Sequence, residues 1–190
     1  MALSNDVSLS RRKLLGAFAG IATISAAPAY ANVFGFLKGA GDVRRIKMYS
    51  QRTGEMIDTI YWIEGDYIKP AMDEINWFML DWRKNEVIQY DRRNIDIIAA
   101  TQRLLETTEP FNMVSGYRSP ETNAMLRRRN RGVANKSYHT RGMAADLKLR
   151  SRSVEQMAAA AVACRSGGVG KYRRSNFVHM DCGPVRTWKG

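Results

Sequence analysis

Histidine and cysteine are scarce in this chain. Its 190 residues include two histidines, His139 and His179, and two cysteines, Cys164 and Cys182. Two cysteines exclude a four-cysteine zinc site, and a structural zinc is closed by four ligands that usually include cysteines. In an oxidising compartment the two cysteines would be free to pair, and two unlinked buried thiols are the alternative. A catalytic metal site needs only three protein ligands, so it is compatible with this composition.

Residues 1–31 have the pattern of an export signal. The pair Arg11-Arg12 precedes an apolar stretch that ends in the small-x-small cleavage pattern Ala29-Tyr30-Ala31. The arginine pair resembles a twin-arginine signal, and a retained membrane anchor is the alternative. No cysteine stands beside the cleavage pattern, so lipidation is not indicated. We expect a mature protein that begins near Asn32, works in the periplasm and has no stable membrane span.

The remaining residues, 32–190, suffice for one domain of ordinary size. Within it we expect a hairpin and helices over residues 43–108 and a metal-site core over residues 109–190. The formal net charge of the whole chain is +12, which favours anionic partners. Outside the cytoplasm nucleic acid is not expected, and the available polyanions are the cell wall and lipid head groups. A basic surface that serves only solubility is the alternative.

The spacing of apolar residues predicts both strands and helices, and therefore an α+β domain. Alternation predicts a hairpin over residues 44–63, and a three-to-four spacing predicts helices over 70–82, 94–107 and 120–130. Asn94 is the expected N-cap of the second helix. A weak capping box, Ser153 with Gln156, starts a helix over 153–164, and the glycines at 167–170 end it. The remaining predicted strands cover residues 111–115, 144–149, 177–180 and 184–188.

Each histidine lies in a segment that also carries a carboxylate. His139 and Asp146 are seven residues apart with Gly142 between them. On one helix that separation is about 10 Å, too far for two ligands of one ion, so a loop that turns at Gly142 and leads into a strand is required. On the predicted strand of residues 177–180, alternation places His179 and Asp181 on the same side. A hydrogen-bonded core histidine is the alternative for either segment alone, and the two segments together favour a joint zinc site.

The first of these segments resembles the signature of a known enzyme family. Ser137-x-His139-x-x-Gly142-x-Ala144-x-Asp146 matches zinc peptidases that include D-alanyl-D-alanine carboxypeptidases, VanX-like dipeptidases and murein endopeptidases. Residues 115–120 are also similar to this family. The N-terminal hairpin, the glycine run at 167–170 and the C-terminal residues 179–188 most resemble its exported murein endopeptidases. The resemblance covers nearly all of the mature chain. It implies a hedgehog or D-Ala-D-Ala-peptidase-like fold, in which a small antiparallel sheet is flanked by helices.

The resemblance also implies roles for individual residues. One Zn²⁺ per chain would be held by His139, Asp146 and His179. Arg118 would stabilise the oxyanion of a tetrahedral intermediate, because a fixed guanidinium offers donors where negative charge develops. For Arg118 the alternative is a surface or phosphate-facing arginine. The expected substrate-binding residues are Tyr117 and Ser137, and Tyr138 is a further candidate for orienting the substrate or the groups around the metal. The alternative for Ser137 is a cap on its own loop.

The general base is the point at which this sequence departs from the family. Many members have a glutamate three residues before the final histidine, and here that position is Asn176. An asparagine side chain cannot accept a proton from water. Asp181 is the preferred candidate, either as base or as the carboxylate that fixes the second ring nitrogen of His179. A carboxylate from elsewhere, or zinc retained without hydrolysis, are the alternatives.

The implied function is hydrolysis of the peptide cross-links of peptidoglycan during cell-wall remodelling. In the subgroup that the chain resembles, the bond is the L,D (3-3) link between two diaminopimelate residues. A D,D-carboxypeptidase or endopeptidase with the same chemistry is one alternative. A noncatalytic wall-binding module that keeps zinc is another, and a polyanion-binding protein with an incidental histidine pair is a third.

Overall fold

The computed structural model describes residues 43–190, and these form a single mixed sheet with helices. The expected export signal lies outside the described residues. The strand order in the sheet is β3-β2-β1-β4-β5-β7-β6-β8, and neighbours are antiparallel except for the parallel pairs β1–β4 and β6–β8. The strands are β1 (Val43–Ser50), β2 (Met56–Ile63), β3 (Asp66–Tyr67), β4 (Phe111–Ser115), β5 (Ala144–Lys148), β6 (Gly168–Tyr172), β7 (Phe177–Asp181) and β8 (Arg186–Lys189).

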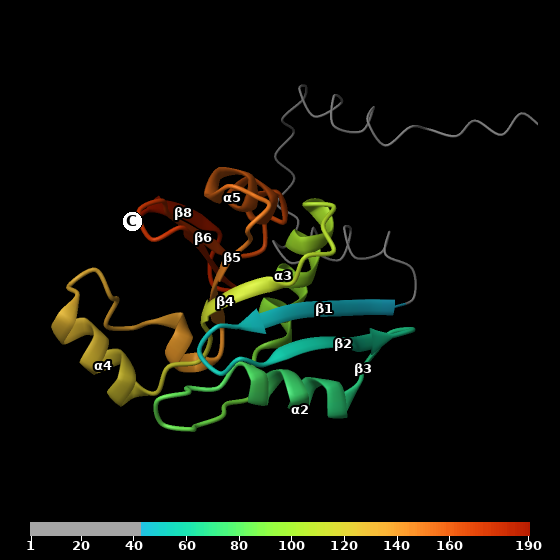
Figure 1. Ribbon diagram of the computed structural model, residues 1–190, viewed down its shortest axis with the longest axis horizontal. Coiled ribbons are helices and arrows are strands. Elements are labelled where there is room, and N and C mark those ends of the chain that lie inside the picture. Colours follow the sequence, from blue (N-terminus) through green and yellow to red (C-terminus); the bar gives the residue numbers. More distant parts are fainter. Residues whose placement is uncertain (1–42) are drawn as a thin grey trace, which may run out of the picture.

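Helices cover one face of the central strands. The helices are α2 (Lys69–Phe78), α3 (Arg92–Leu104), α4 (Pro120–Arg129) and α5 (Val154–Ala163), with a short 3-10 helix η2 (Tyr138–Arg141). α2 packs on β2, α3 on β1 and β7, and α5 on β6 and β7, while α4 extends away from the sheet (Figure 1). The predicted α+β class is confirmed, although the sheet is larger than expected and contains two parallel pairs.

Alternation along the central strands separates the core from the opposite face. Leu147 on β5 and Val178 on β7 are fully buried members of the hydrophobic core. Their strand neighbours Asp146 and His179 therefore point to the face that is opposite the core. Burial of one apolar side chain contributes roughly 1.5–3 kcal/mol, so these two strands are strongly held in register. The core thus fixes where the polar side chains of β5 and β7 lie.

Two of the predicted boundaries are wrong, and one strand was not predicted. The first helix ends at Phe78, short of residue 82, and the chain then turns through an isolated bridge between Asp81 and Glu86. The N-cap of α3 is Asp91, whose side chain accepts the backbone N–H of Arg93, while Asn94 lies inside the helix. The glycine run that was expected only to end a helix forms most of strand β6.

Other local predictions are confirmed. Ser153 and Gln156 make a complete capping box at the start of α5, with both reciprocal hydrogen bonds present. The hairpin β1–β2 pairs in antiparallel fashion from Val43 to Tyr49. Cys164 and Cys182 are buried free thiols, which is the unlinked alternative.

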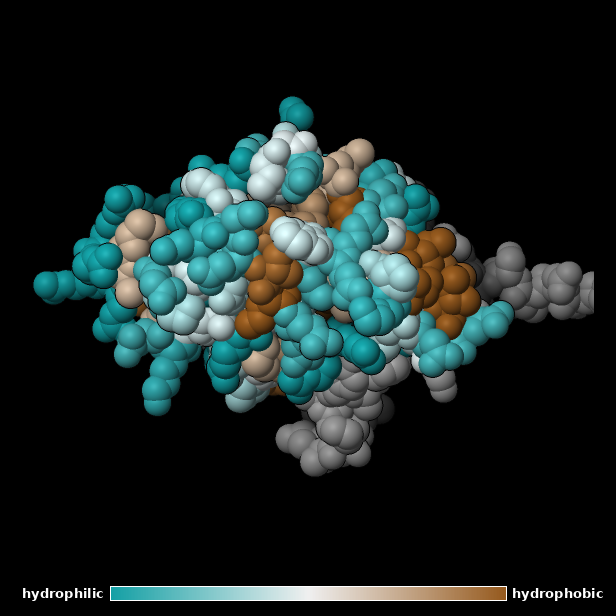
Figure 2. Space-filling model, turned by 90° about the horizontal axis from the view of Figure 1, so that it is seen from below, coloured by the Kyte–Doolittle hydropathy of each residue, from teal (hydrophilic) through white to brown (hydrophobic). Residues whose placement is uncertain are grey.

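The surface is predominantly polar. Figure 2 shows a mostly hydrophilic face on which apolar residues are confined to a few patches. Across residues 43–190, none of the helices has the length and apolar content needed to span a bilayer.

Candidate metal centre

Three elements bring two histidines and one carboxylate to one point. His139 lies on η2, Asp146 on β5 and His179 on β7. The antiparallel register of β5 and β7 pairs Asp146 directly with His179, so their side chains share one face at adjacent positions. All three residues are buried. The structure therefore assembles the three residues that the sequence singled out.

The loop between His139 and Asp146 turns where the sequence predicted. The Ser137 hydroxyl caps η2 by accepting the backbone N–H of His139, which is the capping role considered for this residue. Gly142 ends η2 with a φ of 62°, in the left-handed region that favours glycine. A Cβ at Gly142 would lie 2.9 Å from Ile88 Cγ2 and 3.1 Å from the carbonyl oxygen of Gln89. Conformation and space both require glycine at this turn.

The ligand atoms are spaced as a tetrahedral ion requires. His139 Nε2 lies 3.2 Å from Asp146 Oδ1 and 3.2 Å from His179 Nδ1, and His179 Nδ1 lies 2.9 Å from Asp146 Oδ1. Ligands 2.0–2.1 Å from a tetrahedral zinc are about 3.3 Å apart. Within residues 43–190 this is the one group of three or more His, Cys, Asp and Glu side chains arranged to hold a metal ion. Two imidazoles and a carboxylate are a donor set that suits zinc and leaves one position open.

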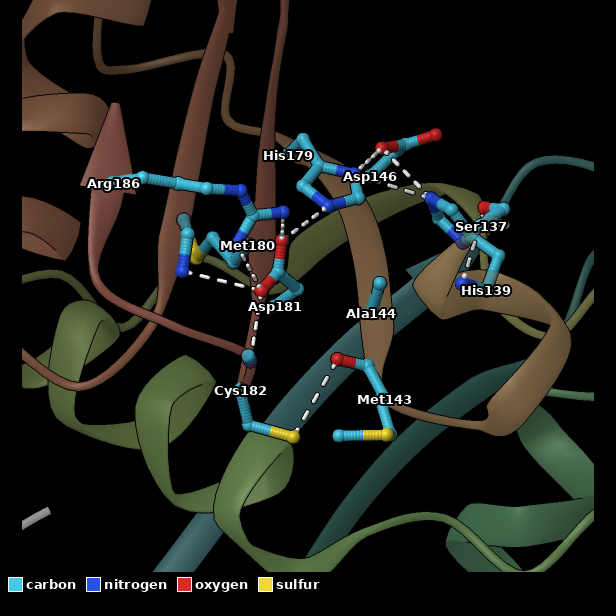
Figure 3. Close-up of polar contacts among 12 residues, drawn as sticks. Ser137, His139, Met143, Ala144, Asp146, His179, Met180, Asp181, Cys182 and Arg186 are labelled. Carbon is cyan, nitrogen blue, oxygen red and sulfur yellow. Dashed lines mark hydrogen bonds and ion pairs between the residues drawn. The ribbon is translucent and has the colours of Figure 1, made fainter. Parts of the chain in front are cut away.

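Hydrogen bonds on the far side of each imidazole leave the correct nitrogen for the metal. His139 donates from Nδ1 to the carbonyl oxygen of Gly116 at 2.7 Å, which leaves Nε2 unprotonated toward the cluster. His179 donates from Nε2 to Asp181 Oδ2 at 3.0 Å, which leaves Nδ1 facing the cluster. Figure 3 shows the His179 ring between the two carboxylates, with one nitrogen toward Asp146 and the other toward Asp181.

The ionisable groups of the site influence one another strongly. Burial, followed by the charge of Arg118, lowers the pKa of His139 from 6.5 to about 4. Burial acts in the same sense on His179, but hydrogen bonds with Asp146 and Asp181 outweigh it and raise the pKa of His179 to about 9. Against the effect of burial, the two imidazoles and Arg118 hold the pKa of Asp146 well below its ordinary value. The pocket thus keeps its carboxylate ionised and one imidazole neutral.

Asp181 is saturated with hydrogen bonds and has no exposed surface. Its Oδ1 accepts the backbone N–H groups of Gly168 and Gly183 at 3.2 and 2.8 Å. Arg186 donates to both oxygens, from Nη1 to Oδ1 at 3.0 Å and from Nη2 to Oδ2 at 2.7 Å. Against the effect of burial, these bonds and that of His179 hold the pKa of Asp181 far below its ordinary value. The carboxylate is therefore a fixed anion behind the His179 ring.

Arg118 lies beside the metal ligands. It donates from Nη2 to Asp146 Oδ2 and from Nε to Ser115 Oγ, the latter at 2.8 Å. Its side chain is 14 % exposed, and among residues 43–190 its Nη1 has no hydrogen-bond partner. One edge of the guanidinium is therefore held by the protein, and the remaining nitrogen can meet a substrate oxygen.

An aromatic wall lies next to His179, and only one of its residues, Tyr138, was singled out from the sequence. The guanidinium of Arg186 lies 5.1 Å from the ring centroid of Tyr138 and 4.8 Å from that of Trp188. The Trp188 ring lies 5.2 Å from the His179 ring, and a Cβ at Gly170 would lie 2.5 Å from it. The signal was present in the small residues of β6, which leave room for a large side chain from the parallel neighbour β8.

The other predicted residues lie at the margin of the site. Tyr117 is half-buried, and its backbone N–H bonds to the carbonyl oxygen of Met79 at 2.8 Å. Asn176 is exposed in the turn between β6 and β7, with a φ of 52°. No contact links either side chain to the three ligand residues within the described part of the chain. Their roles stay predictions.

A protein-family model and several known proteins match this chain over most of its length. A family model described as "Peptidoglycan L,D-endopeptidase MepK" matches residues 38–188. The peptidoglycan L,D-endopeptidase MepK of Escherichia coli strain K12 is 40% identical over 181 residues, which cover 94% of this chain and 97% of the relative. The protein of the same name from Shigella flexneri gives the same values. A probable peptidoglycan L,D-endopeptidase MepK of Haemophilus influenzae is 37% identical over 139 residues, which cover 73% of this chain and 75% of that relative.

Proposed function

We infer that this chain, which belongs to the family of peptidoglycan L,D-endopeptidase MepK, is itself a metal-dependent peptidoglycan endopeptidase. The observation that carries this function is the convergence of His139 Nε2, Asp146 Oδ1 and His179 Nδ1 within 3.2 Å of one another. We propose that the metal is zinc and that the bond is the L,D link between two diaminopimelate residues. The donor set supports zinc, as do the buried hydrogen bonds that hold the far nitrogen of each imidazole.

His139, Asp146 and His179 would hold the ion through the atoms that already face one another. A zinc ion bound there supplies a Lewis acid that polarises the scissile carbonyl and lowers the pKa of a water molecule. The protein holds its three ligand side chains rigid through buried hydrogen bonds at both ends of each imidazole. This arrangement spares the reorganisation that a flexible site would need.

Arg118 is placed to act on the substrate oxygen. Its Nη2 and Nε are fixed by Asp146 and Ser115, so the guanidinium plane has one orientation. We assign Nη1 to donate to the carbonyl oxygen as that oxygen becomes negative during attack. Removal of one such donor typically costs about 10²–10³ in kcat.

Asp181 has the surroundings of a residue that orients His179. The sequence allowed it to be either a base or a partner of the imidazole. Its oxygens accept five hydrogen bonds from protein groups, and His179 stands between it and the other two ligands. A carboxylate with so low a pKa is a weak proton acceptor. We therefore assign Asp181 to fixing the tautomer of His179.

A defined digestion tests the function. Purified protein with zinc is incubated with muropeptide dimers that carry either a 3-3 or a 4-3 cross-link, and the fragments are identified by mass spectrometry. Cleavage of the 3-3 dimer alone is the expected result. Cleavage of the 4-3 dimer would assign the D,D activity, and binding without cleavage of either would assign a zinc-containing wall-binding module.

The place of action follows from the substrate. Peptidoglycan lies outside the cytoplasmic membrane, so we propose a periplasmic protein, exported through the twin-arginine signal expected in residues 1–31. Fusion of residues 1–31 to a reporter that is active only after twin-arginine export is the direct test. Replacement of Arg11-Arg12 by Lys-Lys is expected to retain that reporter in the cytoplasm.

A further inference from the structure

A cationic groove lies beyond the metal ligands on β5. It encloses about 560 Å³, and its lining includes Asn112, Lys148, Arg150, Arg152 and Asn176. Lys148 follows Asp146 by two residues on β5, so both side chains point to the same face, about 7 Å apart along the strand. The register of β4 and β5 pairs Asn112 with Lys148, and the pair of Met113 with Leu147 separates it from the pair of Ser115 with Asp146. A peptide bound at the ligand residues would therefore reach the groove within a few bonds.

The charge of the groove is of one sign. Three basic residues line it, Lys148, Arg150 and Arg152, and none of its lining residues is acidic. The guanidinium of Arg152 donates hydrogen bonds to the carbonyl oxygens of Ser151 and Leu105, at 3.0 and 2.9 Å. Among residues 43–190, neither the Lys148 ammonium nor the Arg150 guanidinium has an ion-pair partner. By contrast, the buried cations Arg44 and Arg118 are both paired with aspartates.

The loop that carries these cations is fixed in place. Both oxygens of Glu109 accept backbone N–H groups of this loop, from Arg150 at 2.8 Å and from Ser151 at 3.1 Å. Glu109 does not line the groove, and its carboxylate is used by the backbone. The loop then enters α5 through the capping box of Ser153. The loop is thus held at both ends by hydrogen bonds to its backbone, and these bonds do not use the side chain of Arg150.

An unpaired acceptor lies opposite Lys148 on the neighbouring strand β4. Asn112 Oδ1 is buried, and it has no hydrogen-bond partner among the residues that the structure describes. A buried amide oxygen without a donor is unfavourable, so a ligand N–H at this place would be stabilised. The groove therefore offers cations for a carboxylate and an acceptor for a neighbouring N–H. A carboxylate next to an N–H is the pair of groups found at the α-carbon of an amino acid.

We propose that this groove is a subsite for the free carboxylate of a diaminopimelate residue adjacent to the scissile bond, bound by Lys148 and Arg150 and with its N–H accepted by Asn112. The proposal rests on the proposed function. Diaminopimelate carries an α-amino carboxylic group at each end, and a cross-link through one end leaves a carboxylate beside the linked nitrogen. Lysine at the same position in the stem peptide has no such carboxylate. The groove would thus select diaminopimelate-type peptidoglycan.

Paired substrates test the subsite. The first is a 3-3 cross-linked muropeptide dimer with free diaminopimelate carboxylates, and the second is the same dimer with those carboxylates amidated. The wild-type protein is expected to cleave the amidated dimer with a kcat/KM lower by about tenfold or more, as for loss of a charged hydrogen bond. Lys148→Gln is expected to raise KM for the free dimer by about tenfold and to change the amidated dimer less than twofold.

A matched variant and a second readout separate the possible failures. Lys84→Gln removes the same charge from an exposed loop outside the groove and is expected to leave both substrates unchanged. Calorimetry with the uncross-linked muropeptide that ends in free diaminopimelate is expected to show weaker binding to Lys148→Gln, at unchanged zinc content. Equal cleavage of both dimers by the wild type would refute the subsite and leave the function standing. If neither dimer is cleaved, the function fails, and wild-type calorimetry that does not distinguish free from amidated carboxylates then refutes the subsite separately.

Discussion

Replacement of Asp181 by asparagine separates the two roles that the sequence allowed for this residue. The substitution keeps the volume of the side chain and removes its charge. It leaves Arg186 with no anionic partner in this site and replaces one of the two acceptor oxygens of residue 181 by an N–H₂ donor that faces other donors. Loss of one member of a buried pair costs about 3–5 kcal/mol. Because the Arg186 side chain is 39 % exposed and water can solvate it, we expect about 2–3 kcal/mol here.

The same substitution is expected to weaken zinc binding by about 10- to 100-fold, as for loss of other carboxylates that orient a ligand histidine. The assays are urea unfolding, a zinc titration against a chromophoric chelator, and cleavage of the 3-3 dimer at saturating zinc. Turnover at saturating zinc is expected to return to within about tenfold of wild type. Asp58→Asn is the matched control, because Asp58 pairs with Arg45 on the hairpin and touches none of the metal ligands.

A different outcome would overturn this assignment. Loss of a general base typically lowers turnover by about 10²–10⁴, and added metal does not restore it. Wild-type zinc affinity combined with such a loss at saturating zinc would show that Asp181 accepts the proton.

Three further predictions follow from the described contacts. Gly142→Ala places a Cβ at a φ of 62° and is expected to lower the free energy of unfolding by about 2 kcal/mol, measured in urea, and to weaken zinc binding. Burial raises the pKa of Cys164 to about 11 and that of Cys182 to about 12, so iodoacetamide at pH 8 is expected to label neither until the protein is unfolded. Against the effect of burial, hydrogen bonds from Ser119 and its neighbours lower the pKa of Asp81, so this carboxylate stabilises the fold above about pH 4 and loses that effect as pH falls through its depressed pKa. Urea unfolding should therefore show Asp81→Asn to be less stable than wild type at pH 7, with the two curves converging toward pH 2.

The convergence of the three candidate ligands could be predicted from the sequence because their geometry is local or alternates along a strand. Gly142 has to turn the chain between His139 and Asp146, and strand alternation places His179 and Asp181 on one side. The sequence left two roles open for Asp181, that of general base and that of hydrogen-bond partner of His179. In the structure Asp146 and Asp181 lie on opposite sides of the His179 ring, which supports the orienting role that we propose for Asp181.

Features that depend on pairing of distant strands could not be predicted. Gly168 and Gly170 lie in a strand because β7 and β8 pair on either side of β6, although glycine by itself disfavours strands. Arg186 meets Asp181 through that same pairing. The start of α3 at Asp91 was missed because two polar residues near the boundary are both good N-caps, and local propensity does not choose between them.

The most direct test of the account is the zinc content of the mature protein, measured by atomic emission together with cleavage of the 3-3 dimer, for wild type and for His139→Ala. We predict one zinc per chain and cleavage in the wild type, and loss of both in the variant, whose fold is retained as judged by circular dichroism. Cleavage by wild-type protein stripped of metal, or full zinc content in His139→Ala, would contradict it.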